Sequence, residues 1–436
     1  MSRIAAIASA LTLSSAVSAA PFQFERLIGQ GEIMPGTDLP VGYVRGASIN
    51  SHGEWAVPVA AGDPGNPDTD FFSGVLGNQG YRLALAVDPD GSPSQQRRMY
   101  YGASINDSGS LATILDRYSS SGQLLSTTAF VDGQQAAVAS PAGSTIEKVR
   151  LDAAGRLLSV SKFGPFGYYS ASEQGAGGEW QQEVFHGWTV PTPVGTGRPV
   201  GLNGWQATLK GDGTRVYSGS FDQEQADGTI VRINGVVVGD QFIAVDGQES
   251  SVPGYHYLSP GGGGVAVNLN GDVGFATGIA TSDSPNGVGG AIVINGEIRQ
   301  ASSWGAGSSG DLGLLTELFN QWGIGSSEFS FDNDQNLLWQ ARSFGQVDPD
   351  VPLNSSALMY NDRLLVKSGD TLDGHFILGI REFSMSNDGS WAIANLIGAD
   401  EDLGQFTEVV YRFQIPTPSS ACLFILTGSH AARRRR

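Results

Sequence analysis

One short turn pattern recurs seven times along the chain. Each copy has an apolar residue, then usually Asn or Asp, two variable residues and a Gly, followed by an apolar segment. The copies begin at Ile49, Ile105, Leu151, Leu209, Val267, Phe331 and Met385. Asn or Asp can hydrogen bond to the backbone of a turn, and Gly tolerates positive φ. Each copy therefore predicts a β-hairpin, and the apolar residues around it alternate as in half-buried strands.

The polar and glycine positions of these turns are the residues on which the repeat depends. They are Asn50, Gly53, Asn106, Gly109, Asp152, Gly155, Gly213, Gly271 and Gly389. The sixth copy has Gln335 in place of glycine. Because Gln tolerates positive φ less well than Gly, we expect that turn to be the least regular.

A second two-residue turn follows each of the first six copies. These turns are predicted at Asp90-Gly91, Asp132-Gly133, His186-Gly187, Asn234-Gly235, Asn295-Gly296 and Asn361-Asp362. Two hairpins per repeat give four strands, and seven such units are typical of a β-propeller. A content of 61 Gly with only 16% charged residues favours short strands over long helices. The predicted fold is all-β, a seven-bladed propeller of four-stranded antiparallel blades.

The seventh copy has no second turn, and the N-terminus contains a segment that could replace it. The sequence from Glu25, "ERLIGQGEIMPG", matches "DRLLVKSGDTLDG" from Asp362, which leads into the seventh copy. We therefore expect the N- and C-terminal strands to pair in one blade and close the array.

One helix is expected near residues 310–322. Leu312, Leu315, Phe319 and Trp322 recur at helical spacing, and Gly323 could end the helix. We interpret it as a scaffold element inserted before the sixth copy rather than as a partner-binding helix.

The N-terminus has the features of a secretory signal over residues 1–19. Arg3 precedes an apolar run that ends at Val17, and small residues lead to a predicted cleavage after Ala19. A membrane helix is the alternative, but the run is shorter than the roughly 20 apolar residues that a span needs.

The C-terminus, residues 416–436, has three parts. Pro416 and Pro418 precede a mostly apolar stretch, and the basic residues Arg433, Arg434, Arg435 and Arg436 end the chain. An apolar segment followed by arginines can enter a bilayer with its charged end on the cytoplasmic side. This order resembles the sorting tail of PEP-CTERM proteins, although Thr417 replaces the usual Glu. The resemblance implies processing by a membrane transpeptidase, an exosortase; a frayed basic tail is the alternative.

The segment between the two ends, residues 20–415, resembles a family of uncharacterised exported bacterial propeller proteins. The resemblance depends on the turn motif and on "GEIMPG" ahead of "SINSHGEWAV". It implies the propeller fold and no particular activity.

Few side chains suggest chemistry. The only cysteine, Cys422, lies in the tail, so residues 20–415 offer no disulfide or thiol nucleophile. The four histidines of that segment lack metal-ligand spacing, and no GxSxG motif occurs. Calcium is the one cofactor considered, at Asp332-Asn333-Asp334-Gln335-Asn336, with Asp88-Pro89-Asp90-Gly91 as a weaker candidate. No catalytic residue is assigned.

These observations predict an exported, non-enzymatic binding or structural protein of the cell envelope or the medium. The formal net charge of −18 argues against binding nucleic acid. The expected partners are the export machinery and the sorting transpeptidase, with an extracellular polysaccharide or a surface protein as possible ligands. The alternative function is a polysaccharide-active hydrolase or lyase on a propeller scaffold, which the fold class alone does not exclude.

Overall fold

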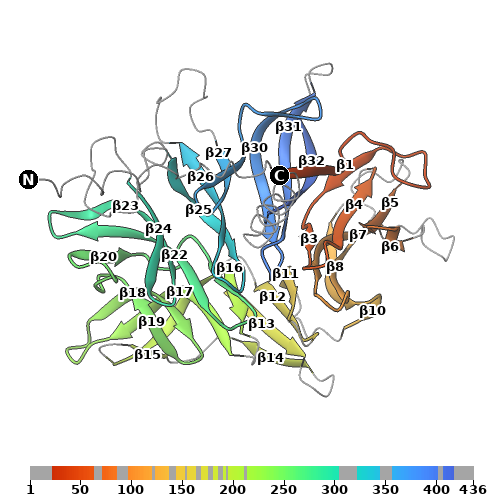
Figure 1. The fold of residues 1–436 in the computed structure, drawn as a ribbon. Helices are drawn as coiled ribbons and strands as arrows, with labels where there is room; N and C mark the ends of the chain where they lie inside the picture. The colour runs from red at the N-terminus through yellow and green to blue at the C-terminus, as the bar shows by residue number, and fades with distance from the viewer. Residues whose placement is uncertain are drawn as a thin grey trace, which may run out of the picture.

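The computed structural model describes most of the chain between the two predicted end segments. The described residues are 22–62, 71–85, 97–119, 123–136, 144–152, 155–163, 168–174, 180–184, 190–192, 195–210, 214–303, 322–343, 356–400 and 406–416. They form 32 strands in seven antiparallel sheets, which follow one another along the chain (Figure 1). The all-β prediction is confirmed.

The first three sheets contain the strands up to Val184. The first sheet holds β2 (Val41–Val44), β3 (Ser48–Ile49), β4 (Trp55–Ala61), β5 (Phe72–Gly77) and β6 (Gly80–Leu85); the second holds β7 (Arg97–Ile105), β8 (Leu111–Tyr118), β9 (Leu124–Val131) and β10 (Gln134–Gln135); the third holds β11 (Ser144–Leu151), β12 (Leu157–Phe163), β13 (Tyr168–Gln174) and β14 (Trp180–Val184).

The other four sheets contain the remaining strands, and the seventh also takes in the N-terminal strand. The fourth sheet holds β15 (Val190–Thr192), β16 (Gly195–Leu209), β17 (Arg215–Glu224), β18 (Ile230–Val238) and β19 (Gln241–Val245), and the fifth holds β20 (Tyr255–Leu258), β21 (Val265–Val267), β22 (Val273–Thr281), β23 (Ser284–Ile294) and β24 (Glu297–Ser303). The sixth sheet holds β25 (Trp322–Phe331), β26 (Leu337–Ser343), β27 (Ser356–Tyr360) and β28 (Arg363–Lys367). The seventh sheet holds β29 (Thr371–Leu372), β30 (His375–Met385), β31 (Trp391–Asp400), β32 (Phe406–Gln414) and β1 (Gln23–Gly29).

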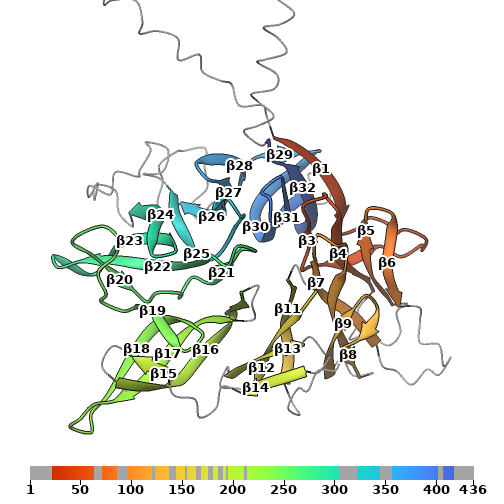
Figure 2. The same ribbon diagram turned by 60° about the horizontal axis from the view of Figure 1, so that its bottom comes forward.

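One strand from each of the seven sheets faces the middle of the molecule (Figure 2). We call β3, β7, β11, β16, β21, β25 and β30 the inner strands. Each inner strand contacts the next one along the chain, and β30 contacts β3. Three described sheets have four strands and four have five, so the prediction of four strands per sheet is only partly right. The extra strands are short, or arise where the first strand of a sheet is broken in two, as with β2 and β3.

The predicted pairing of the N- and C-terminal strands is confirmed. Strand β1 pairs antiparallel with β32, with Gln23 opposite Gln414. We call the β1–β32 pairing the seam. The Arg412 side chain strengthens the seam and also links the seventh sheet to the first. Its Nε donates to Glu25 Oε2 on β1 (2.6 Å), and its Nη1 donates to the Gly53 carbonyl of the first sheet (3.1 Å). The guanidinium also lies 5.1 Å from the ring centre of Trp391.

The hydrophobic cores lie between neighbouring sheets. One cluster joins Val75 of the first sheet to Leu115 of the second, and another joins Ile292 of the fifth to Trp339 of the sixth. Because a sheet inside this array is covered on both faces, β4 is buried from Ala56 to Ala61 without interruption. The expected alternation of buried and exposed residues is therefore wrong for this strand.

Three of the predicted second turns lie where the sequence places them, at Asp132-Gly133, Asn295-Gly296 and Asn361-Asp362. Asn234-Gly235 does not form a turn, because both residues lie inside β18; the turn follows at Gly239-Asp240. Gly235 is needed there for packing, since a Cβ at this position would lie 2.5 Å from the Phe242 ring. In the first sheet the turn is at Asn78-Gln79. Asp90-Gly91 and His186-Gly187 lie outside the described residues.

The helix expected near 310–322 falls almost wholly on residues 304–321, outside the described residues. Its predicted end is wrong, because Trp322 and Gly323 belong to β25 and pair with β26. Within the described ranges no helix is long and apolar enough to cross a membrane. The predicted cleavage and tail residues Val17, Ala19, Pro418 and Arg433–Arg436 also lie outside them, and Pro416 is the last described residue.

Candidate functional site

Each repeat turn joins an inner strand to the next strand of its sheet. In the first sheet, the Asn50 backbone N–H donates to the Glu54 carbonyl (2.9 Å), and Asn50 Oδ1 accepts from the N–H groups of His52 (3.0 Å) and Glu54 (2.9 Å). Gly53 has a φ of 72°. The fourth residue of the other described turns is also left-handed, with φ of 80° at Gly109, 76° at Gly155, 81° at Gly271, 63° at Gln335 and 69° at Gly389.

The sixth turn, with Gln335 in place of glycine, has the same geometry as the others. Gln335 adopts the backbone conformation of the glycines. Its N–H donates to the Asp332 carbonyl (3.1 Å), just as the Gly53 N–H donates to the Asn50 carbonyl (3.0 Å). The expectation that this turn is the least regular is therefore wrong. Gly213 lies outside the described residues.

The turn asparagines also join neighbouring sheets, which the sequence analysis did not predict. Asn50 Nδ2 donates to the Asn106 carbonyl (3.0 Å), and Asn106 Nδ2 donates to the Asp152 carbonyl (3.2 Å). Asn268 Nδ2 donates to the Asp332 carbonyl in the same way (3.0 Å). An amide can accept within its own turn and donate to the next one, whereas an ionised carboxylate can only accept.

The residues that directly follow the first residue of each turn connect five sheets at the same end of the inner strands. Leu269 N–H donates to Asn333 Oδ1 (3.1 Å), and Asn333 N–H donates to the Asn387 carbonyl (2.9 Å). Asn387 Nδ2 donates to Asp107 Oδ2 (3.3 Å), whose Oδ1 accepts from Ser51 N–H (2.8 Å). We call this end of the inner strands the turn end; its hydrogen bonds draw the sheets together.

The segment considered for calcium forms one of these turns. Asp332 Oδ1 accepts from the N–H groups of Asp334 (2.9 Å) and Asn336 (2.8 Å), and Oδ2 accepts from Asn336 Nδ2 (2.8 Å). These oxygens are thus engaged by protein donors. Among the described residues, no group of three or more His, Cys, Asp or Glu side chains is placed to hold a metal ion. The weaker candidate, residues 88–91, lies outside them.

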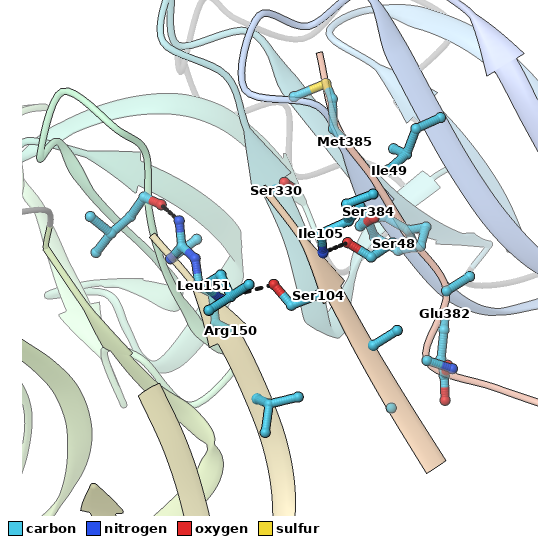
Figure 3. Close-up of a pocket in the computed structure, with 18 of the residues that line it drawn as sticks. Ser48, Ile49, Ser104, Ile105, Arg150, Leu151, Ser330, Glu382, Ser384 and Met385 are labelled. Atoms are coloured by element: carbon cyan, nitrogen blue, oxygen red, sulfur yellow. Dashed lines mark hydrogen bonds between the residues drawn. The ribbon is translucent and has the colours of Figure 1, made fainter. Parts of the chain in front are cut away.

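The inner strands enclose a cavity of about 620 Å³, which we call the central cavity. Six of the seven sheets contribute to its lining. Polar side chains on this wall include Ser48, Ser104, Arg150, Ser330, Glu382 and Ser384 (Figure 3). The volume is in the range of small-molecule sites, which is roughly 300 to 1,000 Å³.

Arg150 is the central cation of this cavity. Its Nη1 donates to Thr208 Oγ1 (2.7 Å) and its Nη2 to the Val267 carbonyl (2.6 Å), so it bridges three sheets through neutral acceptors. Among the described residues, no carboxylate forms an ion pair with it. The nearby Asp152 carboxylate is paired with Arg156 instead (Oδ2 to Nε, 2.6 Å). Burial lowers the pKa of Arg150, and the charge of Asp152 opposes that shift.

Serine hydroxyls line the cavity on the two inner strands that precede the strand of Arg150, β3 and β7. Ser48 Oγ accepts from Ile105 N–H (3.1 Å), and Ser104 Oγ accepts from Leu151 N–H (2.9 Å). Because each oxygen acts there as an acceptor, each hydroxyl still has its own proton to donate. Ser384 Oγ, on inner strand β30, is buried and has no hydrogen-bond partner among the described residues. The cavity therefore has hydroxyl donors on several of its inner strands.

Glu382 lies on the other side of the cavity, away from the turn end (Figure 3). Its Oε2 accepts from Gly46 N–H (2.7 Å), and burial raises its pKa while Arg45 opposes the shift. Gly46 must be glycine, since a Cβ there would lie 2.6 Å from the Gly102 Cα atom. Tyr101, whose backbone oxygen is close to Gly46, also lines this end.

A second buried carboxyl, that of Asp116, lies on β8 next to inner strand β7. We expect it to make the stability of the protein depend on pH. Burial raises its pKa to about 6, although Tyr118 Oη donates to its Oδ2 (3.3 Å). A raised folded-state pKa means that ionisation destabilises the fold. The loss of stability caused by ionised Asp116 is absent below about pH 4, grows as the pH rises, and is complete above about pH 6. Asp116→Asn should therefore raise the free energy of unfolding at pH 7 by about 2 to 3 kcal/mol, and by much less at pH 4.

Asp388 provides a control of opposite sign. Burial by itself raises its pKa, but hydrogen bonds from Ser386 and Ser390 outweigh burial and hold the pKa below its usual value. Asp388→Asn should therefore destabilise the protein at pH 7 and lose this effect as the pH falls. Denaturant unfolding of both variants at pH 4 and pH 7 tests the pair. Parallel pH profiles for Asp116→Asn and the natural protein would contradict the prediction.

Of the three charged residues that line the cavity, the turn pattern marked only Asp152; Arg150 and Glu382 were not predicted, although a signal for Arg150 exists. Two positions before each turn residue the seven repeats have Ser48, Ser104, Arg150, Thr208, Ala266, Ser330 and Ser384. The single arginine in a series of small residues stands out once the repeats are aligned. Glu382 has no comparable signal, because the equivalent positions vary.

No protein-family model matches the chain, and no curated protein matches it. Among solved structures it is similar to a protein of unknown function from Dyadobacter fermentans DSM 18053 (12% identity, 90% of this chain and 99% of that chain, TM-score 0.34). It is also similar to a neuraminidase-like protein from A/bat/Guatemala/164/2009 (9% identity, 92% of this chain and 95% of that chain, TM-score 0.36). A third similar structure is Porphyromonas gingivalis dipeptidyl peptidase 4 (8% identity, 85% of this chain and 59% of that chain, TM-score 0.34). These likenesses say nothing of activity.

Proposed function

We propose that this chain is an exported, non-enzymatic binding protein, built as a closed seven-bladed propeller, whose ligand occupies the central cavity. The observation that carries the proposal is a cavity of about 620 Å³ with donor groups on its wall that the described protein leaves unused. The contacts between successive inner strands, and between β30 and β3, support the closed ring.

A hydrolase or lyase acting on polysaccharide is the alternative. Most glycoside hydrolases use two carboxyl groups that lie about 5 to 9.5 Å apart across the bond to be cleaved. Two acidic residues line the described part of the cavity, Asp152 and Glu382. Asp152 is a turn residue, whereas Glu382 lies four residues before the turn residue of its own strand. Measured along the strand direction, the two residues are therefore about 13 Å apart. This spacing favours binding over hydrolysis.

The two ends support export. The predicted signal over 1–19 and the PEP-CTERM-like tail over 416–436 would place residues 20–415 at the envelope or in the medium, after contact with the export machinery and a sorting transpeptidase. The chain enters β1 and leaves β32 at the same end of one sheet, since Gln23 is opposite Gln414. A tail there would tether the ring beside its seam. Fractionation of cells that express the chain without 416–436 tests this; an unchanged envelope-to-medium ratio would refute it.

Thermal unfolding of the exported protein with a panel of neutral and acidic glycans tests the binding proposal. A ligand at about 100 times its Kd should stabilise the protein by about 2.7 kcal/mol, and the shift should saturate. Sucrose is the control, because excluded solutes stabilise proteins without saturation. No saturable shift with any glycan would refute binding. Release of new reducing ends from a glycan in the same mixtures would instead favour the hydrolase.

A further inference from the structure

The central cavity holds a positive charge that the described protein does not neutralise. Arg150 has five N–H donors, and its two hydrogen bonds to described residues go to the neutral oxygens of Thr208 and Val267. A charge withdrawn from water is costly unless it is paired. The equivalent positions of the other repeats have Ser, Thr or Ala, so packing at this position does not require an arginine.

The hydroxyls on Arg150's side of the cavity complement an anion rather than a cation. Ser104 lies on the neighbouring inner strand β7, and Ser48 lies on the one before it, β3. Their hydroxyl protons remain available, because both oxygens are acceptors for backbone N–H groups. Ser384 Oγ, on the same strand as Glu382, is buried without a described partner. A guanidinium with a hydroxyl donor on the next strand fits a ligand with several acceptor oxygens on one group, such as a carboxylate.

The opposite side of the cavity presents an acceptor. Glu382 retains Oε1, while its Oε2 accepts from Gly46 N–H (2.7 Å). A ligand that reaches both sides therefore needs an anionic group at one end and donors, such as hydroxyls, at the other. A small inorganic anion would satisfy Arg150 and leave most of the 620 Å³ without contacts.

We propose that the central cavity binds an acidic sugar, with its carboxylate on Arg150 and its hydroxyls directed toward Glu382. This inference rests on the proposed binding function and names the class of its ligand, a uronate unit of an extracellular polysaccharide. The sugar enters from the Glu382 side, because hydrogen bonds among Asp107, Asn333 and Asn387 draw the sheets together at the turn end.

A zwitterionic amino acid also has an anionic and a donor end, but the site suits it less well. An ammonium group is held best by an ionised Glu382, and burial disfavours ionisation by raising the pKa of that carboxyl. A hydroxyl can hydrogen bond to either form of the carboxyl. The serine-lined wall between the two charges likewise offers partners to a polyhydroxylated ligand and few to a compact amino acid.

The acidic surface of the protein makes Arg150 decisive. With a net charge of −18, the long-range field opposes the approach of any anion. Affinity for a uronate must therefore come from local contacts. Loss of the two or more charge-assisted hydrogen bonds that Arg150 can supply should weaken binding about 100-fold or more.

Isothermal titration calorimetry on the full exported chain tests the proposal. The probes are trimers of galacturonate, glucuronate and mannuronate, with a neutral galactose trimer, free glutamate and inorganic sulfate for comparison. We expect at least one uronate trimer to bind at least about tenfold more tightly than every comparison probe, the difference that one charge-assisted hydrogen bond gives. Arg150→Met should weaken that binding about 100-fold, and Arg150→Lys about tenfold, because lysine keeps the charge without the planar fork.

Two further variants keep the test independent of folding. Ser384→Ala removes a hydroxyl without a described protein partner, so it should leave stability unchanged and weaken uronate binding about threefold to tenfold. Arg232→Met is the matched control for lost charge, because Arg232 pairs with Asp222 on the exposed part of the fourth sheet (2.9 Å) and should not affect binding. Thermal unfolding checks each variant.

The outcomes separate this inference from the proposed function. Saturable binding of the neutral trimer with no loss in Arg150→Met would overturn the acidic-sugar assignment and leave a binding protein. Tighter binding of glutamate or sulfate than of every uronate would also overturn it. No binding of any glycan would refute both proposals. Uronate binding that depends on Arg150 and Ser384 but not on Arg232 would establish the inference.

Discussion

Replacing Gly389 by alanine should lower the free energy of unfolding by about 2 to 5 kcal/mol. Gly389 has a φ of 69°, a region in which a Cβ costs about 1 to 2 kcal/mol. In addition, a Cβ there would lie 2.0 Å from Asp332 Oδ2, a contact between the seventh and sixth sheets. Asp332 cannot move away easily, because it accepts three hydrogen bonds from Asp334 and Asn336. Breaking part of that turn accounts for the additional 1 to 3 kcal/mol, about the cost of leaving buried polar groups unpaired.

Gly155 is the matched control for this variant. It has a φ of 76°, yet no atom of the described residues lies within 4 Å of a Cβ built on it. Gly155→Ala should therefore incur only the backbone cost of about 1 to 2 kcal/mol. Urea unfolding of the two variants measures the difference. Equal losses would mean that the contact with Asp332 contributes nothing, and that the repeat glycines serve only the local turn.

This pair of glycines marks how far the sequence could predict the fold. The repeat predicted the hairpin turns, because Asn or Asp and Gly act on their own backbone within a few residues. It did not predict that Gly389 approaches Asp332, or that Asn50 donates to the Asn106 carbonyl, because these contacts join sheets. Asn234-Gly235 failed for the same reason: pairing with β17 and β19 overrode a dipeptide that favours turns.

The candidate site was less predictable than the fold. Arg150 and Glu382 line one cavity, although 232 positions separate them in the sequence. Their proximity follows only from the closed arrangement of inner strands, which brings the third and seventh sheets to a common centre. Neither residue belongs to a short motif. Aligning the repeats would have marked Arg150 as exceptional, but not the cavity that it faces.

Replacing Ile28 by alanine should destabilise the protein by about 2 to 4 kcal/mol, the usual cost of truncating a buried isoleucine. Ile28 is only 4% exposed on closing strand β1 and packs with Ile393 and Val410 of the seventh sheet and Val57 of the first. The loss should therefore fall on the seam that closes the ring. Phe24 on the same strand is the control: it is 42% exposed, so Phe24→Ala should cost about 1 kcal/mol or less.

Hydrogen exchange can show whether this loss opens the seam or merely weakens the whole fold. If β1 closes the ring, Ile28→Ala should accelerate exchange at Val409 and Tyr411 of β32 more than at Ile292 of the distant fifth sheet. An uncovered β32 would also present an unpaired edge, on which other chains can assemble. Faster exchange at all three positions alike would mean that the ring unfolds as one unit. Pairing of β1 with β32 would then not be a separate step of folding. Acceleration confined to β32 would make β1 the last strand to dock.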